Sequence, residues 1–136
     1  MPTILVLDDY ASNLNVISLI LRSNGYEVLE AGSGAEAVRI CQSHAGPIHL
    51  LIADVKLPDT SGPHVALRVI ESCPDMAILF VSGTPLRGWT TDETAILERS
   101  PPGSFEILEK PFTPSVLNEI VQRLVSQRFR SARPNM

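Results

Sequence analysis

The chain alternates strand-length apolar runs with segments of helical period, and it does so five times. Three runs are continuous, as in the central strands of a parallel sheet covered on both faces: 3–7 (TILVL), 49–54 (HLLIAD) and 77–82 (AILFVS). The run at 26–31 (YEVLEA) alternates, as a less buried edge strand does, and 105–109 (FEILE) is a weaker fifth. This alternation predicts an α/β fold built on five parallel strands.

Helices are expected between and after these strands. Ser33 and Glu36 have the spacing of a capping box, and Pro114 suits the first position of the last helix. The expected helices are 12–24, 33–44, 63–73, a short 90–100 and 113–128. Connected by such helices, the strands form a doubly wound sheet with helices on both faces. Ligands of these sheets bind at the carboxyl ends of the strands.

Size and composition are those of one globular domain, with 136 residues, of which 44% are hydrophobic and 19% charged. The net charge of -4 argues against direct binding to nucleic acid. No apolar run is long enough to span a bilayer, and the N-terminus has no signal-peptide pattern. We therefore expect a cytoplasmic protein that does not engage a membrane, with Cys41 and Cys73 as reduced thiols.

Polar residues follow four of the five predicted strands at their carboxyl ends. They are Asp8 and Asp9, Asp54, Ser82 and Lys110. Any one of them could be a cap or turn residue, but their joint occurrence on one edge of a sheet indicates a site. Three carboxylates in one pocket need a cation, and Mg²⁺ is the hard ion that keeps waters and shares its shell with phosphate. One carboxylate can then act as a nucleophile toward a phosphoryl group.

Four segments in order along the chain sharpen this assignment: ILVLDD, LLIADVKLPDTSG, ILFVSG and LEKPF. With them the chain resembles the receiver domain of bacterial two-component response regulators, over roughly residues 3–127. The resemblance implies the flavodoxin-like receiver fold, with strand order 2-1-3-4-5. We assign residues 1–128 to this domain and 129–136 to a polar tail that is expected to be disordered.

The resemblance also implies a metal site and a phosphoacceptor. Asp54 would accept a phosphoryl group from the phosphohistidine of a sensor histidine kinase or a phosphotransfer protein. Asp9 and Asp54 would bind Mg²⁺ directly, Asp8 would act through water, and the main-chain carbonyl of Lys56 would complete the protein ligands. Lys110 would pair with a phosphoryl oxygen.

Further roles follow from the same resemblance. Ser82 would contact the phosphoryl group and move on activation, while the small Gly83 leaves room for backbone amides near the phosphate. The bond between Lys110 and Pro111 would be cis. Phosphorylation would switch contacts with an unknown downstream protein. A homodimer is a further possible assembly of such a domain. The chain would catalyse only its own phosphorylation and dephosphorylation, so we do not class it as an enzyme.

Three features depart from the family pattern. Ile107 stands where the family carries Tyr or Phe, and Phe105 lies two residues earlier on the same face, so either Phe105 substitutes or, as we favour, the aromatic part of the switch is missing. The segment 83–103 is long and rich in Pro and Gly, and its Trp89 is either a partner anchor or a cover for the sheet. Lys56 is either a solvated loop residue or a neighbour of the phosphoryl group.

Two other readings remain open. One is a docking module of the same fold whose signalling ignores phosphate, which Ile107 favours and the complete set of acids opposes. The other is a receiver excised from a hybrid histidine kinase or a larger regulator. A phosphatase with an aspartate nucleophile would carry a second acid where Lys56 stands, and a flavin-binding protein would carry a phosphate loop in place of DDYASN.

Overall fold

The computed structural model describes residues 1–83, 88–100 and 105–132, with the side chains of 127–132 left out. Its elements are, in order, β1 (Thr3–Leu7), α1 (Ala11–Ser23), β2 (Glu27–Ala31), α2 (Gly34–Ser43), β3 (Leu50–Asp54), α3 (Gly62–Val69), β4 (Ala77–Ser82), α4 (Thr91–Arg99), β5 (Phe105–Glu109) and α5 (Pro114–Ala132). The predicted alternation of strands and helices is confirmed.

The five strands form one parallel sheet in the order β2-β1-β3-β4-β5. This is the predicted order, and it puts the alternating strand β2 and the weaker strand β5 at the two edges. The side chains of β1 and β4 are all buried, whereas those of β5 are partly exposed. Continuous apolar runs therefore mark the strands that are covered on both faces.

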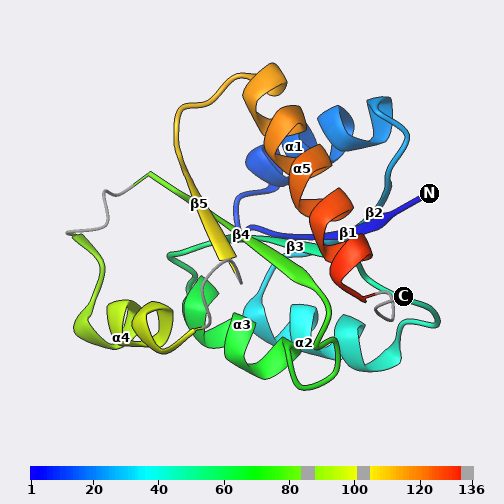
Figure 1. Cartoon of the computed structure of the whole chain (residues 1–136). Helices are drawn as coiled ribbons and strands as arrows, with labels where there is room; N and C mark the ends of the chain where they lie inside the picture. Colours follow the sequence, from blue (N-terminus) through cyan, green and yellow to red (C-terminus); the bar gives the residue numbers. More distant parts are fainter. Residues whose placement is uncertain (84–87, 101–104, 133–136) are drawn as a thin grey trace.

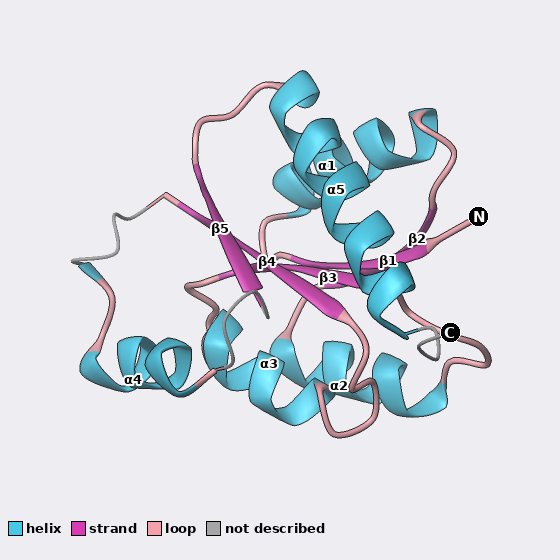
Figure 2. Ribbon diagram, in the orientation of Figure 1, coloured by secondary structure: helices cyan, strands magenta, loops and turns pink. Residues whose placement is uncertain are grey.

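Helices cover both faces of the sheet, with α1 and α5 on one side and α2, α3 and α4 on the other (Figures 1 and 2). Each face has its own hydrophobic core. One core joins Ile17 and Leu21 of α1 to Leu117 and Val121 of α5. The other core contains Phe80 of β4 together with residues of α2, α3 and α4. Alternate residues of each strand feed the two cores, because successive side chains point to opposite faces.

Local signals account for most helix ends. Ser33 accepts a hydrogen bond from the backbone N–H of Glu36 at the start of α2, and Thr90 and Glu93 form a complete capping box at the start of α4. Helix α3 ends at Val69, four residues before the predicted end at 73, and the chain continues as a turn in which Cys73 N–H donates to the Val69 carbonyl. The following Pro74 disfavours helical geometry at Cys73.

The C-terminal helix is longer than predicted. It continues to Ala132, so residues 129–132 of the expected tail are helical, while 133–136 lie outside the described residues. In the long segment 83–103, residues 84–87 and 101–103 also lie outside them, and the short helix expected at 90–100 is observed as α4. Within the described ranges no helix has the length and apolarity that crossing a membrane requires. Both cysteines are free, as expected.

Candidate functional site

The parallel register brings the predicted polar residues to one edge of the sheet. Asp8 follows β1 directly, while Asp54 and Ser82 are the last residues of β3 and β4. Lys110 follows β5, and its backbone N–H donates to the Ser82 carbonyl over 2.8 Å. Residues separated by more than 50 positions in the sequence therefore meet because parallel strands end on the same side.

Three carboxylates converge at this edge. One oxygen each from Asp8, Asp9 and Asp54 lies within 4.8 Å of the others. Asp8 is 3% exposed, whereas Asp9 is open to solvent. Burial raises the pKa of the Asp8 carboxyl above its usual 3.8; the hydrogen bond from Tyr10 N–H and the Lys110 ammonium lower it, and the charges of Asp54 and Asp9 raise it further. The donor set is all oxygen and strongly anionic, which fits a hard divalent cation such as Mg²⁺.

Among the described residues, Lys110 supplies a cation to this cluster. Its Nζ lies 3.4 Å from Asp54 Oδ2 and 3.8 Å from Asp8 Oδ2. Counting only the residues that the structure describes, one ammonium faces three carboxylates, a balance that favours binding of a further cation. The peptide bond to Pro111 is cis, as predicted.

The loop after β3 is held close to Asp54. Lys56 N–H donates to Asp54 Oδ1 over 3.3 Å, and the backbones of Lys56 and Ser61 form an isolated antiparallel bridge. Gly62 begins α3 against the end of β3, and a Cβ at this position would lie 2.6 Å from the Asp54 carbonyl oxygen. Only a residue without a side chain permits this approach. Asp59 of the same loop accepts hydrogen bonds from the first backbone amides of α2.

The aromatic residues on this side of the sheet surround the strand position of Ile107 without occupying it. Ile107 pairs with Phe80, whereas Phe105 pairs with Ile78, four strand positions before Ser82. The Phe105 ring packs on Phe80 with 5.9 Å between ring centroids. Phe105 is thus part of the hydrophobic core near Phe80, and the absence of a substitute for the ring missing at Ile107 stays a prediction.

Trp89 is a cover for the sheet rather than an exposed anchor. It is 7% exposed and meets the Phe80 ring edge to face, with 6.1 Å between centroids. Gly83, by contrast, is exposed, and a Cβ there would meet nothing within 4 Å. Among the described residues nothing crowds Gly83, and its role beside the phosphate stays a prediction.

Sequence reasoning missed Glu93. This carboxylate is 4% exposed, and its Oε1 lies 2.9 Å from Lys56 Nζ. Burial alone would raise the pKa of Glu93, but the hydrogen bond from Thr90 N–H and the Lys56 ammonium outweigh it and lower that pKa. The capping-box spacing from Thr90 was a visible signal for the helix start, but nothing in the sequence linked Glu93 to Lys56, 37 residues away.

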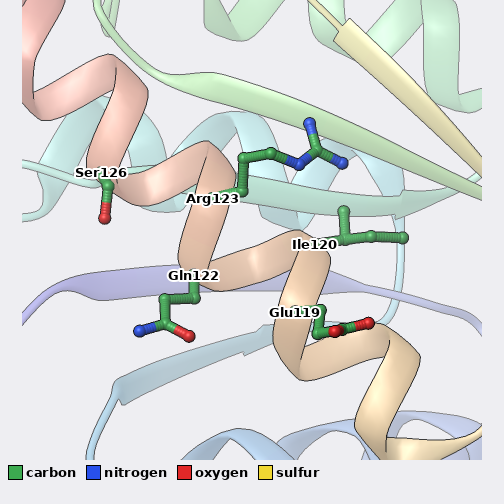
Figure 3. Close-up of a pocket in the computed structure, with 5 residues that line it drawn as sticks. All are labelled: Glu119, Ile120, Gln122, Arg123 and Ser126. Carbon is green, nitrogen blue, oxygen red and sulfur yellow. The ribbon is translucent and has the colours of Figure 1, made fainter.

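A surface hollow elsewhere on the molecule is separate from this cluster. Figure 3 shows that its lining residues all come from α5: Glu119, Ile120, Gln122, Arg123 and Ser126. Arg123 is held by a two-pronged hydrogen bond to Glu106 of β5, at 2.8 and 2.6 Å. None of the predicted site residues lines this hollow.

Comparison with known proteins agrees with the fold and with the acidic cluster. Residues 4–122 match the model of the response regulator receiver domain family. The chain belongs to this family. Receiver domains are components of two-component systems, where they bind Mg²⁺ at an acidic pocket and interact with histidine kinases or phosphotransfer proteins and with downstream partners. They are not conventional enzymes.

The individual relatives differ in length, from a protein about as long as this chain to a much longer kinase. It is 29% identical to the response regulator receiver protein CpdR of Brucella abortus, covering 93% of this chain and 99% of that protein. It is 31% identical to the sensor kinase CckA of the same species over 79% of this chain, but it spans only 11% of that kinase. A CheY-like receiver from Methanospirillum hungatei shares the fold with a TM-score of 0.83, at 23% identity, over 97% of this chain and 99% of the other.

Proposed function

We propose that the chain is a phosphorylation-dependent switch in which Asp54 is the phosphoacceptor. The observation that carries this proposal is the position of Asp54, at the end of β3 between the Lys110 ammonium and the carboxylates of Asp8 and Asp9. Its side chain is 14% exposed, so an outside phosphodonor can reach it. A phosphohistidine of a histidine kinase or a phosphotransfer protein is the donor class.

The transfer is a single displacement. An oxygen of the Asp54 carboxylate attacks phosphorus, the bond between phosphorus and the histidine nitrogen breaks, and the imidazole retains the electron pair and takes a proton. Lys110 faces the phosphoryl oxygens as a fixed positive charge. In this proposal Ser82, the last residue of β4, and the neighbouring Gly83 would contact the transferred group.

The protein ligands for Mg²⁺ in this proposal are Asp9 and Asp54, with Asp8 acting through water and the Lys56 main-chain carbonyl completing the set. When bound, the ion would neutralise charge on the carboxylates and on the phosphoryl oxygens. The loop between Lys56 and Gly62 is held at the end of β3, because Gly62 N–H donates to the Val55 carbonyl and Lys56 N–H donates to Asp54 Oδ1, and it would present the Lys56 carbonyl to the ion.

A partner surface lies beside this site. Tyr10 follows the acidic pair directly and is 67% exposed, and Leu19 on α1 is also 67% exposed. Tyr10 adjoins the acidic pair, whereas Leu19 lies about two turns further along α1, and exposed apolar side chains of this kind suit a transient protein contact. We propose that the phosphodonor approaches over this surface. We also propose that the chain contacts a downstream protein and can form a homodimer, and we assign no residues to these contacts.

A second candidate is a docking module that signals without phosphate, and Ile107 in place of the aromatic residue favours it. Both candidates are compatible with the chain serving as a receiver within a larger protein, as the similarity to a sensor kinase suggests. Phosphorylation chemistry separates the two candidates directly.

The test is exposure of the chain to acetyl phosphate with Mg²⁺, followed by intact mass spectrometry. We expect one phosphoryl adduct that is stable in acid, labile in base and absent when Mg²⁺ is chelated. Asp54→Ala should abolish the adduct, and Asp92→Asn, which removes an exposed carboxylate on α4, should not. No adduct on the unmodified chain, or an equal adduct on Asp54→Ala, would refute the phosphoacceptor role.

A further inference from the structure

Lys56 and Glu93 join the loop after Asp54 to the start of α4. The ammonium of Lys56 lies 2.9 Å from Oε1 of Glu93, and the backbone N–H of Thr90 donates to the same oxygen over 2.9 Å. Glu93 N–H in turn donates to Thr90 Oγ1 over 3.1 Å. One carboxylate thus completes the capping box of α4 and holds the lysine.

The two partners differ in their freedom to move. The Glu93 side chain is 5% exposed, whereas that of Lys56 is 46% exposed. A nearly buried carboxylate needs a cation or hydrogen bonds because its hydration has been removed. A half-exposed lysine with four rotatable carbons can leave one anion for another at little steric cost.

Lys56 is also adjacent to the proposed phosphoacceptor. Its backbone N–H already donates to Asp54 Oδ1, so the base of its side chain is fixed two residues from that carboxylate. A phosphoryl group on Asp54 would carry up to two negative charges in place of the single charge of the carboxylate, within reach of the ammonium. The phosphoryl group and Glu93 would then compete for one cation.

Helix α4 is placed to respond to this competition. It lies at the outer end of its layer beyond α3 (Figure 1), and it packs against α3. Its buried side chains are Glu93, Ile96 and Leu97. With so small an apolar contact, the charge and capping contacts of the first turn carry a large share of what holds the helix in place.

We infer that Glu93 is a positioning residue for Lys56, and that their ion pair couples the phosphorylation state of Asp54 to the N-terminal turn of α4. The inference rests on the proposed function and adds a route by which the modification leaves the site. When the lysine turns to the phosphoryl group, Glu93 is left buried without its cation, and the first turn of α4 loosens. This route does not use the strand position of Ile107, where the family's aromatic residue is missing.

Thermodynamic linkage makes the coupling reciprocal. If phosphorylation weakens the contact of Lys56 with Glu93, removal of that contact must strengthen the interaction of Lys56 with the phosphoryl group. Glu93→Gln keeps an oxygen acceptor for Thr90 N–H and removes the charge that holds the lysine. We therefore expect Glu93→Gln to bind the phosphoryl mimic beryllofluoride about 5-fold more tightly than the unmodified chain, a coupling at the lower end of the usual range.

The experiment is amide hydrogen exchange of α4 in Mg²⁺, with and without beryllofluoride, while fluorine NMR reports whether the mimic is bound. In the unmodified chain we expect exchange of the α4 amides at residues 94–99 to become at least about 5-fold faster when the mimic binds. In Lys56→Met and in Glu93→Gln these rates should be the same with and without the mimic. Asp92→Asn removes a carboxylate from the same turn without touching Lys56, and it should behave as the unmodified chain does.

The outcomes separate this inference from the proposed function. Bound mimic without a change in α4 exchange, or an equal change in Lys56→Met, overturns the coupling and leaves the phosphoacceptor role intact. If fluorine NMR shows no bound mimic in the unmodified chain, the proposed function fails and the coupling fails with it. Lys56→Met gives a second answer if Glu93→Gln does not fold, because Lys56 lies half exposed on a loop.

Discussion

The substitution Asp8→Asn is expected to stabilise the metal-free protein and to weaken its stabilisation by Mg²⁺. Asp8 is 3% exposed, and its Oδ1 accepts a hydrogen bond from Tyr10 N–H over 2.9 Å. Asparagine has nearly the same shape and keeps an oxygen acceptor for this bond. The substitution therefore removes a buried charge with little change in packing.

Three charge interactions of Asp8 set the magnitude. Its carboxylate lies within 4.8 Å of those of Asp9 and Asp54, and two unit charges at that distance repel by roughly 3.5 kcal/mol at an effective dielectric constant of about 20. The Lys110 ammonium at 3.8 Å attracts it by about 4.4 kcal/mol on the same scale. The two repulsions together exceed the attraction, and burial adds to the cost of the charge. Because Asp9 is exposed, solvent screening reduces the excess of repulsion over attraction. We therefore expect Asp8→Asn to raise the free energy of unfolding by about 1 kcal/mol.

Urea unfolding near neutral pH measures this gain. In EDTA, Asp8→Asn should have the higher free energy of unfolding. In Mg²⁺ at 100 times the dissociation constant, the unmodified chain should gain about 2.7 kcal/mol, and the variant should gain clearly less at the same concentration. Asp92→Asn is the control, because it removes an exposed carboxylate away from the cluster. A variant that is destabilised in EDTA, or that keeps the full gain from Mg²⁺, would refute the electrostatic reasoning.

The pH dependence gives an independent check with a definite sign. The pKa of Asp8 is raised in the folded state, so the folded chain binds this proton more tightly than the unfolded chain does. Its contribution to stability is complete below pH 3.8 and is lost as the pH rises through the raised pKa. In EDTA, the unmodified chain should lose this part of its stability over that window, and Asp8→Asn should not.

Three further predictions concern the surroundings of the site. Gly62→Ala should lower the free energy of unfolding, measured in urea, by about 1–3 kcal/mol, because the added Cβ would meet a backbone oxygen. Gly83→Ala should leave that free energy nearly unchanged, and equal effects of the two substitutions would contradict this account. Iodoacetamide at about pH 8 should modify Cys73 before Cys41, because burial and the neighbouring thiol raise the pKa of Cys41 to about 12. Equal rates of modification, measured by peptide mass spectrometry, would contradict this prediction. Glu93→Gln should lower the free energy of unfolding in urea, and this loss should be largest near neutral pH. The loss should shrink as the pH falls below 4.5 and through the lowered pKa of Glu93. A loss that does not depend on pH would rule out the ion pair as its cause.

Much of the site could be predicted because it lies at strand ends. A parallel sheet gathers the residues at the end of each strand at one edge, so Asp8, Asp54, Ser82 and Lys110 could be placed together from their positions at the ends of the predicted strands. The family resemblance then added roles for these residues, and those roles remain proposals. Helix ends were less predictable. Helix α3 ends at Val69 rather than at the predicted residue 73, because the chain forms a hydrogen-bonded turn between Val69 and Cys73 before it reaches Pro74.

The amino-acid sequence by itself determined the five strands, the central character of three of them and the acidic edge, because hydrophobic period and strand-end residues are local properties. The tertiary structure alone decided the contacts between distant segments. It buried Trp89 against Phe80, brought Gly62 against the Asp54 carbonyl and placed the buried Glu93 on Lys56. Those contacts depend on how loops and helices pack across the sheet, and no local pattern in the sequence encodes that geometry.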